Sequence, residues 1–237
     1  MGPNSIGSLS SATFTPNSSL TTIGALAFEG TGLTSISIPN SVSEIGSGAF
    51  QNASSLESVA FTEFSVLTEI SDHTFRGTEI ASIHIPQTVT SIGKHAFFNV
   101  SSLETVTFDG VPTITSIGAR AFQGTSVAEI TIPASVTSIG VGAFALVHDL
   151  TEVTFAESSS ITTIGANAFQ GTGLTTIAIP ASVSTLGNAA FLNAVDLSTV
   201  TIADGSGLGR INNSVFQGTN LSSFRIPPTV ATIGAFA

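Results

Sequence analysis

A repeat of 23 or 24 residues runs through the whole chain of 237 residues. Each unit opens with an apolar residue that begins an L-x-x-I-x-I/F pattern. The ten opening residues are Leu9, Leu33, Leu56, Ile80, Leu103, Val127, Leu150, Leu174, Leu197 and Leu221. Steps of 24 and 23 residues alternate, so two unit types form a larger period of 47 residues. One such unit cannot bury its own apolar face and must pack on its neighbours. The sequence therefore predicts a single solenoid domain of ten coils over residues 9–237, with an incomplete last coil and residues 1–8 as a leader or appended segment.

Each unit begins with a short segment in which apolar and polar residues alternate, as in 35–38 and 105–108. This period, with many β-branched residues, is typical of a short strand with one buried face. In the even units a proline follows the strand directly, at Pro39, Pro86, Pro133, Pro180 and Pro227, whereas the odd units have two extra residues there. The V/I-T/S-x-I-G and x-x-A-F segments that follow are too short for a helix. We expect a β-rich solenoid with a parallel sheet of neighbouring strands and short turn or 3₁₀ segments opposite.

A phenylalanine recurs once per unit, usually after an alanine. The recurring residues are Phe28, Phe50, Phe75, Phe97, Phe122, Phe144, Phe169, Phe191 and Phe216. Stacked coils place equivalent residues above one another, so the rings are expected to form one interior column. Each buried ring contributes about 1.5–3 kcal/mol.

The composition excludes several classes of partner. Only 8% of the residues are charged, and the formal net charge is −10. An acidic surface repels phosphate backbones and anionic lipid, so nucleic-acid binding and membrane-surface binding are not expected. There is no cysteine for a disulfide or a thiolate metal site. No signal peptide and no membrane-spanning apolar run are visible, so membrane insertion is not expected either.

The repeat resembles the BspA-like, or Treponema-type, class of leucine-rich repeat. The pattern I-x-I-P-x-S-V-x-x-I-G-x-x-A-F is carried by Thr131-Ile132-Pro133, Ser135-Val136, Ile139-Gly140 and Ala143-Phe144, and it recurs over essentially the whole chain. The resemblance implies a secreted or cell-surface protein that acts in adhesion, in binding of host or matrix proteins, or in aggregation between cells. It supplies no catalytic residues.

The outward positions of the strands form columns of small hydroxyl-bearing residues, because equivalent positions in adjacent coils become neighbours. The candidate binding face is Ser82, His84, Thr105, Thr107, Glu129, Thr131, Glu152 and Thr154. Its expected ligand is a protein or a glycan. Within it, Glu129 and Glu152 adjoin, and two such carboxylates either hold a cation, share a proton, or remain solvated and independent.

Two further columns carry polar residues. His73, His95 and Arg120 fall at equivalent positions, which predicts either a metal-binding histidine pair or a locally basic edge, and Lys94 is expected to pair with Asp72. The Thr/Ser column before the recurring glycines is expected to cap the following turn or, alternatively, to order water as an ice-binding array does. The column is Thr21, Ser43, Thr68, Thr90, Thr115, Thr137, Thr162 and Ser184. The glycines themselves recur in every coil, so they are interpreted as turn residues rather than a phosphate loop.

No acid, base and nucleophile converge in any column, so the chain is expected to be non-catalytic, without a metal site and without a cofactor. The leading hypothesis is a secreted or surface-displayed module for adhesion or for protein or glycan binding. The alternative is a structural solenoid that stacks end to end. The last unit stops early, with three residues from Ile233 to Phe236 where other units have five. This end indicates either a segment cut from a longer array or a surface that meets another copy.

Overall fold

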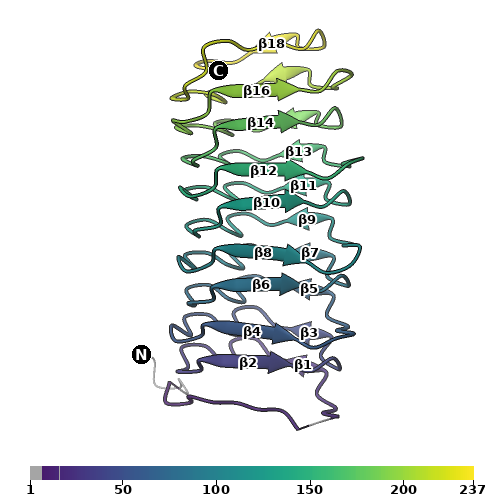
Figure 1. Cartoon of the computed structure of the whole chain (residues 1–237), viewed down its shortest axis with the longest axis vertical. Helices are drawn as coiled ribbons and strands as arrows, with labels where there is room; N and C mark the ends of the chain where they lie inside the picture. Colours follow the sequence, from purple (N-terminus) through teal and green to yellow (C-terminus); the bar gives the residue numbers. More distant parts are fainter. Residues whose placement is uncertain (1–6, 16) are drawn as a thin grey trace.

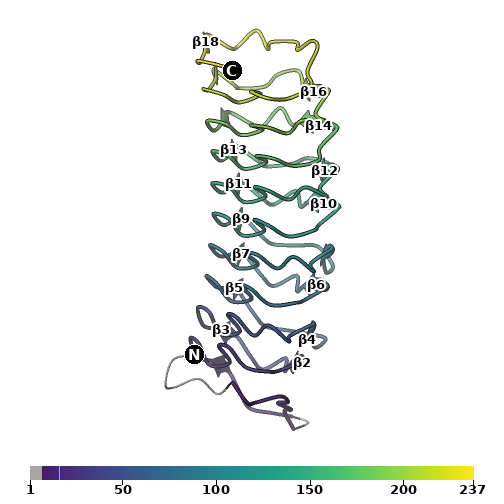
Figure 2. The same cartoon turned by 90° about the vertical axis from the view of Figure 1, so that its left-hand side faces the viewer.

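The computed structural model describes residues 7–15 and 17–237, and in this part the chain winds into a parallel β-solenoid that contains no helix (Figure 1). The coils lie one above another along the long axis, with the N-terminal coil at one end and the C-terminal coil at the other (Figure 2). The predicted solenoid is confirmed. Of the segment predicted as a leader, residues 1–6 lie outside the described residues.

A four-residue strand forms one side of eight successive coils, the strand side of the molecule. The strands are β2 (Ser35–Ile38), β4 (Ser58–Phe61), β6 (Ser82–Ile85), β8 (Thr105–Phe108), β10 (Glu129–Ile132), β12 (Glu152–Phe155), β14 (Thr176–Ile179) and β16 (Thr199–Ile202). Their side chains alternate between the interior and solvent, as a strand with one buried face requires. In β10, Ile130 and Ile132 are buried while Glu129 and Thr131 are exposed.

The strand side is not one continuous sheet, although the sequence predicts that all neighbouring strands pair. The ladder bonds join strands only in four dyads, β2–β4, β6–β8, β10–β12 and β14–β16. The arrows in Figure 1 accordingly come in pairs with a wider gap between pairs. The joints between dyads, β4/β6, β8/β10 and β12/β14, have no strand pairing.

The proline that follows the first strand of each dyad, β2, β6, β10 or β14, explains the joints. Within a dyad, the residue after the second strand donates its N–H to the carbonyl of the last residue of the first strand. Asp109 donates in this way to Ile85 at 2.9 Å, and Ala156 to Ile132 at 3.0 Å. Across the β8/β10 joint the equivalent donor is Pro133, which has no N–H to give to the carbonyl of Phe108. The alternation of unit types in the sequence thus becomes an alternation of paired and unpaired strands.

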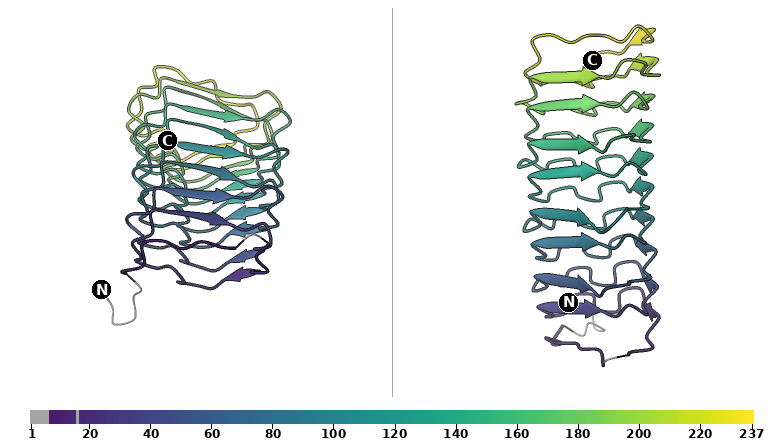
Figure 3. Two further views of the ribbon diagram at one scale, coloured as in Figure 1. Left: turned by 60° about the horizontal axis from the view of Figure 1, so that its bottom comes forward. Right: turned by 45° about the vertical axis from the view of Figure 1, so that its right-hand side comes forward.

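A second set of strands lies on another side of each coil (Figure 3). These two-residue strands are β1 (Thr22–Ile23), β3 (Glu44–Ile45), β5 (Glu69–Ile70), β7 (Ser91–Ile92), β9 (Ser116–Ile117), β11 (Ser138–Ile139), β13 (Thr163–Ile164), β15 (Thr185–Leu186), β17 (Arg210–Ile211) and β18 (Thr232–Ile233). Six of them, β5, β7, β9, β11, β13 and β15, form one parallel sheet. β1 pairs separately with β3, and β17 with β18. The sequence predicts only turn or 3₁₀ segments here. The described residues contain no 3₁₀ helix, and the V/I-T/S-x-I segments pair as strands because the coils stack them in register.

The glycine that follows most of the short strands lets successive backbones approach closely. A Cβ on Gly140 would lie 2.7 Å from the backbone nitrogen of Ala119 in the preceding coil, a distance no side chain tolerates. The short-strand sheet is interrupted at two places, between β3 and β5 and between β15 and β17. At both, the residue after the later strand is not glycine but Ser71 or Asn212. The recurring glycines are therefore structural, as predicted, and their role is contact between coils.

The turns that follow the short strands also stack, and together with those strands they form the ladder side of the molecule. Their backbone N–H groups donate to carbonyl oxygens of the next coil. Examples are the bonds from Phe75 to Ala96, from Phe97 to Ala121 and from Phe122 to Ala143, each 2.8 Å long. This ladder continues across the sheet interruption at β5, where Phe50 donates to Thr74 at 2.9 Å.

The predicted phenylalanine column is confirmed. The rings from Phe28 to Phe216 stack with centroids 5.1–5.7 Å apart and planes within 20° of parallel. The rings from Phe50 to Phe191 are completely buried, and they form the centre of one continuous core. Phe236 does not belong to this column. It has a positive φ of 56°, like Ala189 and Ser214 in the turns of earlier coils, and its side chain is 77% exposed.

Candidate binding face

The candidate binding face lies on the strand side, where the strands aim every second side chain at solvent. The register brings its eight residues together as four cross-strand pairs. These are Ser82 with Thr105, His84 with Thr107, Glu129 with Glu152, and Thr131 with Thr154. All eight side chains are exposed. The β8/β10 joint divides the face, with two pairs on each side of it.

The two glutamates lie side by side, as the column predicts. Glu129 and Glu152 are register partners in the β10–β12 dyad, and the hydroxyl of Thr154 donates to Glu152 Oε1 at 3.1 Å. Within the described residues, no three His, Cys, Asp or Glu side chains are placed to hold one metal ion. The pair therefore presents carboxylate oxygens, which accept hydrogen bonds, at an open surface.

The other dyad of the face carries a hydrogen-bonded pair. His84 Nδ1 and Thr107 Oγ1 share a hydrogen bond across β6 and β8, and which atom donates depends on the histidine tautomer. This bond engages one ring nitrogen of His84 on the exposed face. The two halves of the face thus differ in chemistry, one carrying two carboxylates and the other an imidazole among hydroxyls.

Three large hollows open on the strand side, and two of them lie over unpaired joints between dyads. The first, of about 590 Å³, is lined by residues 12–15, by Asn17 and Ser18, and by β2. The second, of about 790 Å³, lies over the β8/β10 joint, and the third, of about 940 Å³, lies over the β12/β14 joint. Concave surface therefore occurs at two of the three unpaired joints, β8/β10 and β12/β14.

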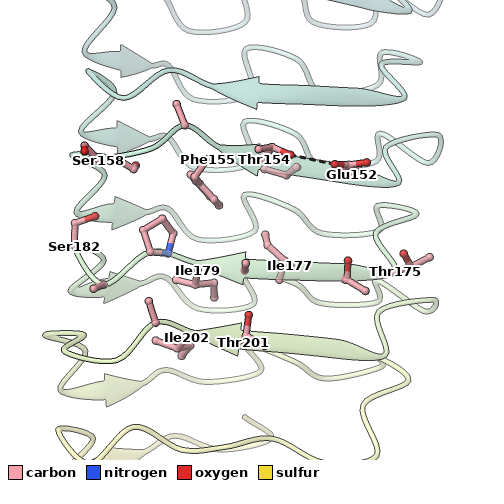
Figure 4. A pocket seen from close by; sticks show the side chains of 18 of the residues that line it. Glu152, Thr154, Phe155, Ser158, Thr175, Ile177, Ile179, Ser182, Thr201 and Ile202 are labelled. Atoms are coloured by element: carbon pink, nitrogen blue, oxygen red, sulfur yellow. Dashed lines mark hydrogen bonds between the residues drawn. The ribbon is translucent and has the colours of Figure 1, made fainter.

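The β12/β14 hollow is shown from close by in Figure 4. Glu152 and its hydrogen-bonded partner Thr154 lie on one strand, and Thr175 and Ser182 lie on the coil that follows. The hydroxyl of Ser182 is buried and has no hydrogen-bond partner among the described residues. Glu152 also lines the β8/β10 hollow, so its carboxylate forms the boundary between the two.

Several residues of the β8/β10 hollow are absent from the predicted face. Glu104 precedes β8, Phe108 ends it, and Val111 and Pro112 follow it in the loop of the odd unit. Val111 is 83% exposed. The outward strand positions do not include them, because Glu104, Val111 and Pro112 lie outside the strand and Phe108 occupies an inward position. The available signal is the alternation of proline after the even strands with two extra residues after the odd ones.

The histidine column lies on the ladder side, away from the candidate face. His73, His95 and Arg120 all have positive φ, and the two imidazole rings are 4.8 Å apart. Burial, then the neighbouring His73 and the cations around it, lowers the pKa of His95 to about 4. Burial and the nearby Arg76 lower the pKa of His73 as well. Both rings are therefore neutral at pH 7, and both Nδ1 atoms are buried without a partner among the described residues.

The predicted ion pair between Lys94 and Asp72 is wrong. Asp72 Oδ1 instead accepts a hydrogen bond from the backbone N–H of Lys94 at 2.6 Å. The one ion pair in the described residues joins Arg225 and Asp204 at 3.3 Å, and both side chains are strongly exposed. The carboxylate is taken by the backbone because the close stacking of coils brings a main-chain donor nearer than the flexible lysine side chain.

One interpretation of the sequence predicts that the Thr/Ser column before the glycines caps the following turn. The structure shows a different use of these hydroxyls. Its hydroxyls donate to the carbonyl of the equivalent residue in the preceding coil, as from Thr115 to Thr90 at 3.1 Å and from Thr137 to Thr115 at 3.0 Å. Thr162 donates to Thr137 in the same way at 3.1 Å. These bonds commit the hydroxyl protons to the protein, which weighs against a water-ordering array.

The repeat matches a known family along most of its length. The model of the BspA-type leucine-rich repeat region matches in six copies, over residues 4–116, 68–197 and 115–237. The chain belongs to this family. A search of curated protein sequences finds no match.

Several solved structures are similar to the chain over about nine-tenths of its length. The pneumococcal vaccine antigen PcpA is 21% identical with a TM-score of 0.51, over 91% of this chain and 66% of that one. The leucine-rich repeat protein of T. pallidum is 19% identical with a TM-score of 0.52, over 90% and 77%. A leucine-rich cell surface protein of Faecalibacterium prausnitzii is 26% identical with a TM-score of 0.49, over 90% and 73%. The likeness to the first two shows a shared fold.

None of the described residues forms a helix of the length and apolar character that crossing a bilayer needs.

Proposed function

We propose that the chain is a non-catalytic binding module, secreted or displayed at a cell surface, that holds a protein or glycan partner on its strand side. The observation that carries this proposal is the hollowed strand side itself. Its outward residues are polar and mostly small, and concave surface lies at two of its dyad joints, β8/β10 and β12/β14. Membership of the BspA-type family supports a surface role, because the resemblance implies adhesion and binding of host or matrix proteins.

The strand side is an open face and differs in this from a catalytic site. An active site brings an acid, a base or a nucleophile into one enclosed place. Here the carboxylates, the imidazole and the hydroxyls are spread along an open face rather than gathered in one enclosed place. A rigid face with spaced hydroxyl, carboxylate and apolar groups is suited to a large ligand that contacts several coils at once.

The test is binding of the purified chain to a panel of extracellular-matrix proteins and to a glycan array. The blocking variant carries Thr107→Tyr and Thr131→Tyr, which fill the face on both sides of the β8/β10 joint. The matched control carries Ser116→Tyr and Ser138→Tyr on the outward positions of the short-strand sheet. We expect at least one ligand to bind the wild-type chain and the control, and to bind the blocking variant at least tenfold more weakly. Equal binding by both variants, or no ligand in either collection, would refute the proposal.

End-to-end self-association is the alternative that one observation favours. The coil of residues 221–237 exposes the apolar side chains of Ile226, Ile233 and Phe236, which are 48%, 55% and 77% exposed. Exposed apolar groups gathered at one place commonly mark a contact surface. Light scattering over a range of concentrations tests this alternative, because a mass that stays that of one chain at every concentration contradicts it.

A further inference from the structure

The hollow over the β8/β10 joint is rich in hydrogen-bond acceptors and carries no cation of its own. Three carboxylates line it, those of Glu104, Glu129 and Glu152. None of the residues that line it is Lys, Arg or His. The formal net charge of the whole chain is −10, so the long-range field adds to the local one. A ligand that fits this hollow must therefore supply donors and positive charge.

The backbone adds a further acceptor to the same place. The carbonyl of Phe108 faces the following even unit, where Pro133 stands at the position that donates an N–H within a dyad. No backbone group of the described residues donates to that carbonyl in the structure. A main-chain carbonyl without a donor from the protein can accept a hydrogen bond from an incoming N–H without breaking a bond between coils.

One wall of the hollow is apolar. The ring of Phe108 is partly buried at the end of β8, and Val111 and Pro112 lie beside it in the loop. Val111 exposes 83% of its side chain to solvent. An apolar wall beside carboxylates suits a side chain with an aliphatic stem and a charged head, since such chains bury the stem and leave the head among polar groups.

We propose that this hollow, within the binding function proposed above, receives an arginine side chain from an extended cationic segment of a partner protein. The guanidinium group has five N–H donors and no acceptor, and it matches carboxylates in a bidentate manner. Its stem packs on Phe108 and Val111, and its head reaches Glu129 and Glu152. A divalent cation fits less well, because no three of the described acidic side chains are placed around one point.

The experiment uses three synthetic eight-residue peptides in which threonine alternates with arginine, lysine or citrulline. Citrulline keeps the shape of arginine but removes its charge. Binding to the full chain is measured by fluorescence anisotropy at low ionic strength, where exposed charge pairs are least screened. We expect the arginine peptide to bind, the lysine peptide to bind several-fold more weakly, and the citrulline peptide not to bind.

Two pairs of variants separate the hollow from the general acidity of the chain. Glu129→Gln with Glu152→Gln removes two charges from the hollow, and Glu44→Gln with Glu69→Gln removes two from the short-strand side. Val111→Ser removes the apolar wall, and Phe64→Ser makes the same change at the equivalent loop position before the β4/β6 joint, where the side chain is 84% exposed. We expect the first member of each pair to lower the affinity for the arginine peptide at least fivefold. The second member should change this affinity less than twofold.

Equal losses in the two glutamate variants overturn the proposal, because they show only a diffuse effect of net charge. Failure of every peptide to bind the wild-type chain also overturns it. All substituted side chains are exposed, and an unchanged thermal unfolding midpoint checks that each variant is folded. A matrix protein that the strand-side tyrosine variant loses, but that Glu129→Gln with Glu152→Gln retains, leaves the proposed function standing and refutes the arginine site alone.

Discussion

The strand side and the ladder side of the solenoid are built from the same repeats but are interrupted in different ways. On the strand side the hydrogen bonding stops after every second strand, at each proline of an even unit. On the ladder side six successive short strands pair without a break, and the turns stack beside them. Within the described residues, the pairing of the short strands is interrupted only where Ser71 and Asn212 replace the recurring glycine, and the turns still stack across the interruption at β5.

Two physical causes lie behind these interruptions. Proline removes a donor, so the strands lose a bond but no atoms collide. A side chain in place of glycine adds a Cβ where the preceding backbone lies within 3 Å, so the strands are pushed apart. The first cause leaves polar backbone groups and concave surface open to a partner. The second costs contact between coils, which is what holds a solenoid together. Stability is therefore concentrated on the ladder side and binding surface on the strand side.

The largest expected effect comes from the phenylalanine column that packs behind the ladder side. Phe122→Ala removes a completely buried ring that stacks on Phe97 at 5.1 Å and on Phe144 at 5.3 Å. We expect the free energy of unfolding to fall by about 3–5 kcal/mol, because the cavity is enclosed by packed coils. Urea unfolding followed by circular dichroism measures it.

Phe108→Ala is the matched change on the strand side. Its ring is only partly buried at the edge of the β8/β10 hollow. We expect a loss of about 1–2 kcal/mol, since less apolar surface is returned to water. If the two variants lose equal stability, the division into a stabilising side and a binding side is wrong.

A smaller effect is expected from exchanging serine and glycine on the ladder side. Gly140→Ser places a side chain against the backbone of Ala119, as Ser71 does between β3 and β5, and should lower the free energy of unfolding by about 1–3 kcal/mol. Ser71→Gly should instead let β5 pair with β3 and extend the sheet. Amide hydrogen exchange at the short strands reports both changes.

Gly24→Ala is the control for this exchange. Gly24 occupies the same column, but no described atom lies within 4 Å of the position its Cβ would take, and its φ is not positive. We expect stability to stay the same or to rise by up to about 1 kcal/mol, because alanine restricts the unfolded chain. A loss as large as that of Gly140→Ser would show that local backbone conformation, rather than contact between coils, selects glycine.

The sequence is sufficient to predict whatever depends on equivalent positions stacking on one another. The ten coil starts, the ring column and the adjacency of Glu129 and Glu152 follow from spacing alone. These predictions need only the period of the repeat and the alternation of a strand, and neither depends on the exact path of the backbone between coils.

The sequence is insufficient where the distance between coils decides the outcome. The V/I-T/S-x-I segments are too short to show a strand period, so their pairing becomes visible only once they are stacked. Asp72 binds the backbone N–H of Lys94 rather than its side chain for the same reason. The hollows depend on a bond that is missing between two units, and a pattern read within one unit does not contain it.

The smallest effect on stability, and the sharpest test of the comparison, comes from Pro133→Ala. The change gives the β8/β10 joint the donor that Ala156 provides to Ile132 within the next dyad. A new hydrogen bond gains about 0.5–1.5 kcal/mol, while the freer unfolded chain costs about 0.4–1 kcal/mol. The free energy of unfolding should therefore change by less than about 1 kcal/mol. The new amide at position 133 should exchange with solvent as slowly as that of Ala156, and NMR-detected hydrogen exchange measures both.

The same substitution should weaken binding at the strand side, because pairing β8 with β10 consumes the carbonyl of Phe108 and narrows the hollow. We expect the arginine peptide to bind Pro133→Ala several-fold more weakly than the wild-type chain. Pro180→Ala makes the equivalent change at the β12/β14 joint and should leave that peptide unaffected. Fast exchange at position 133 would mean that the two extra residues of the odd unit, and not the missing donor, keep the dyads apart. In that case the hollow is set by loop length, and shortening the 109–112 loop, rather than restoring an N–H, becomes the change that closes it.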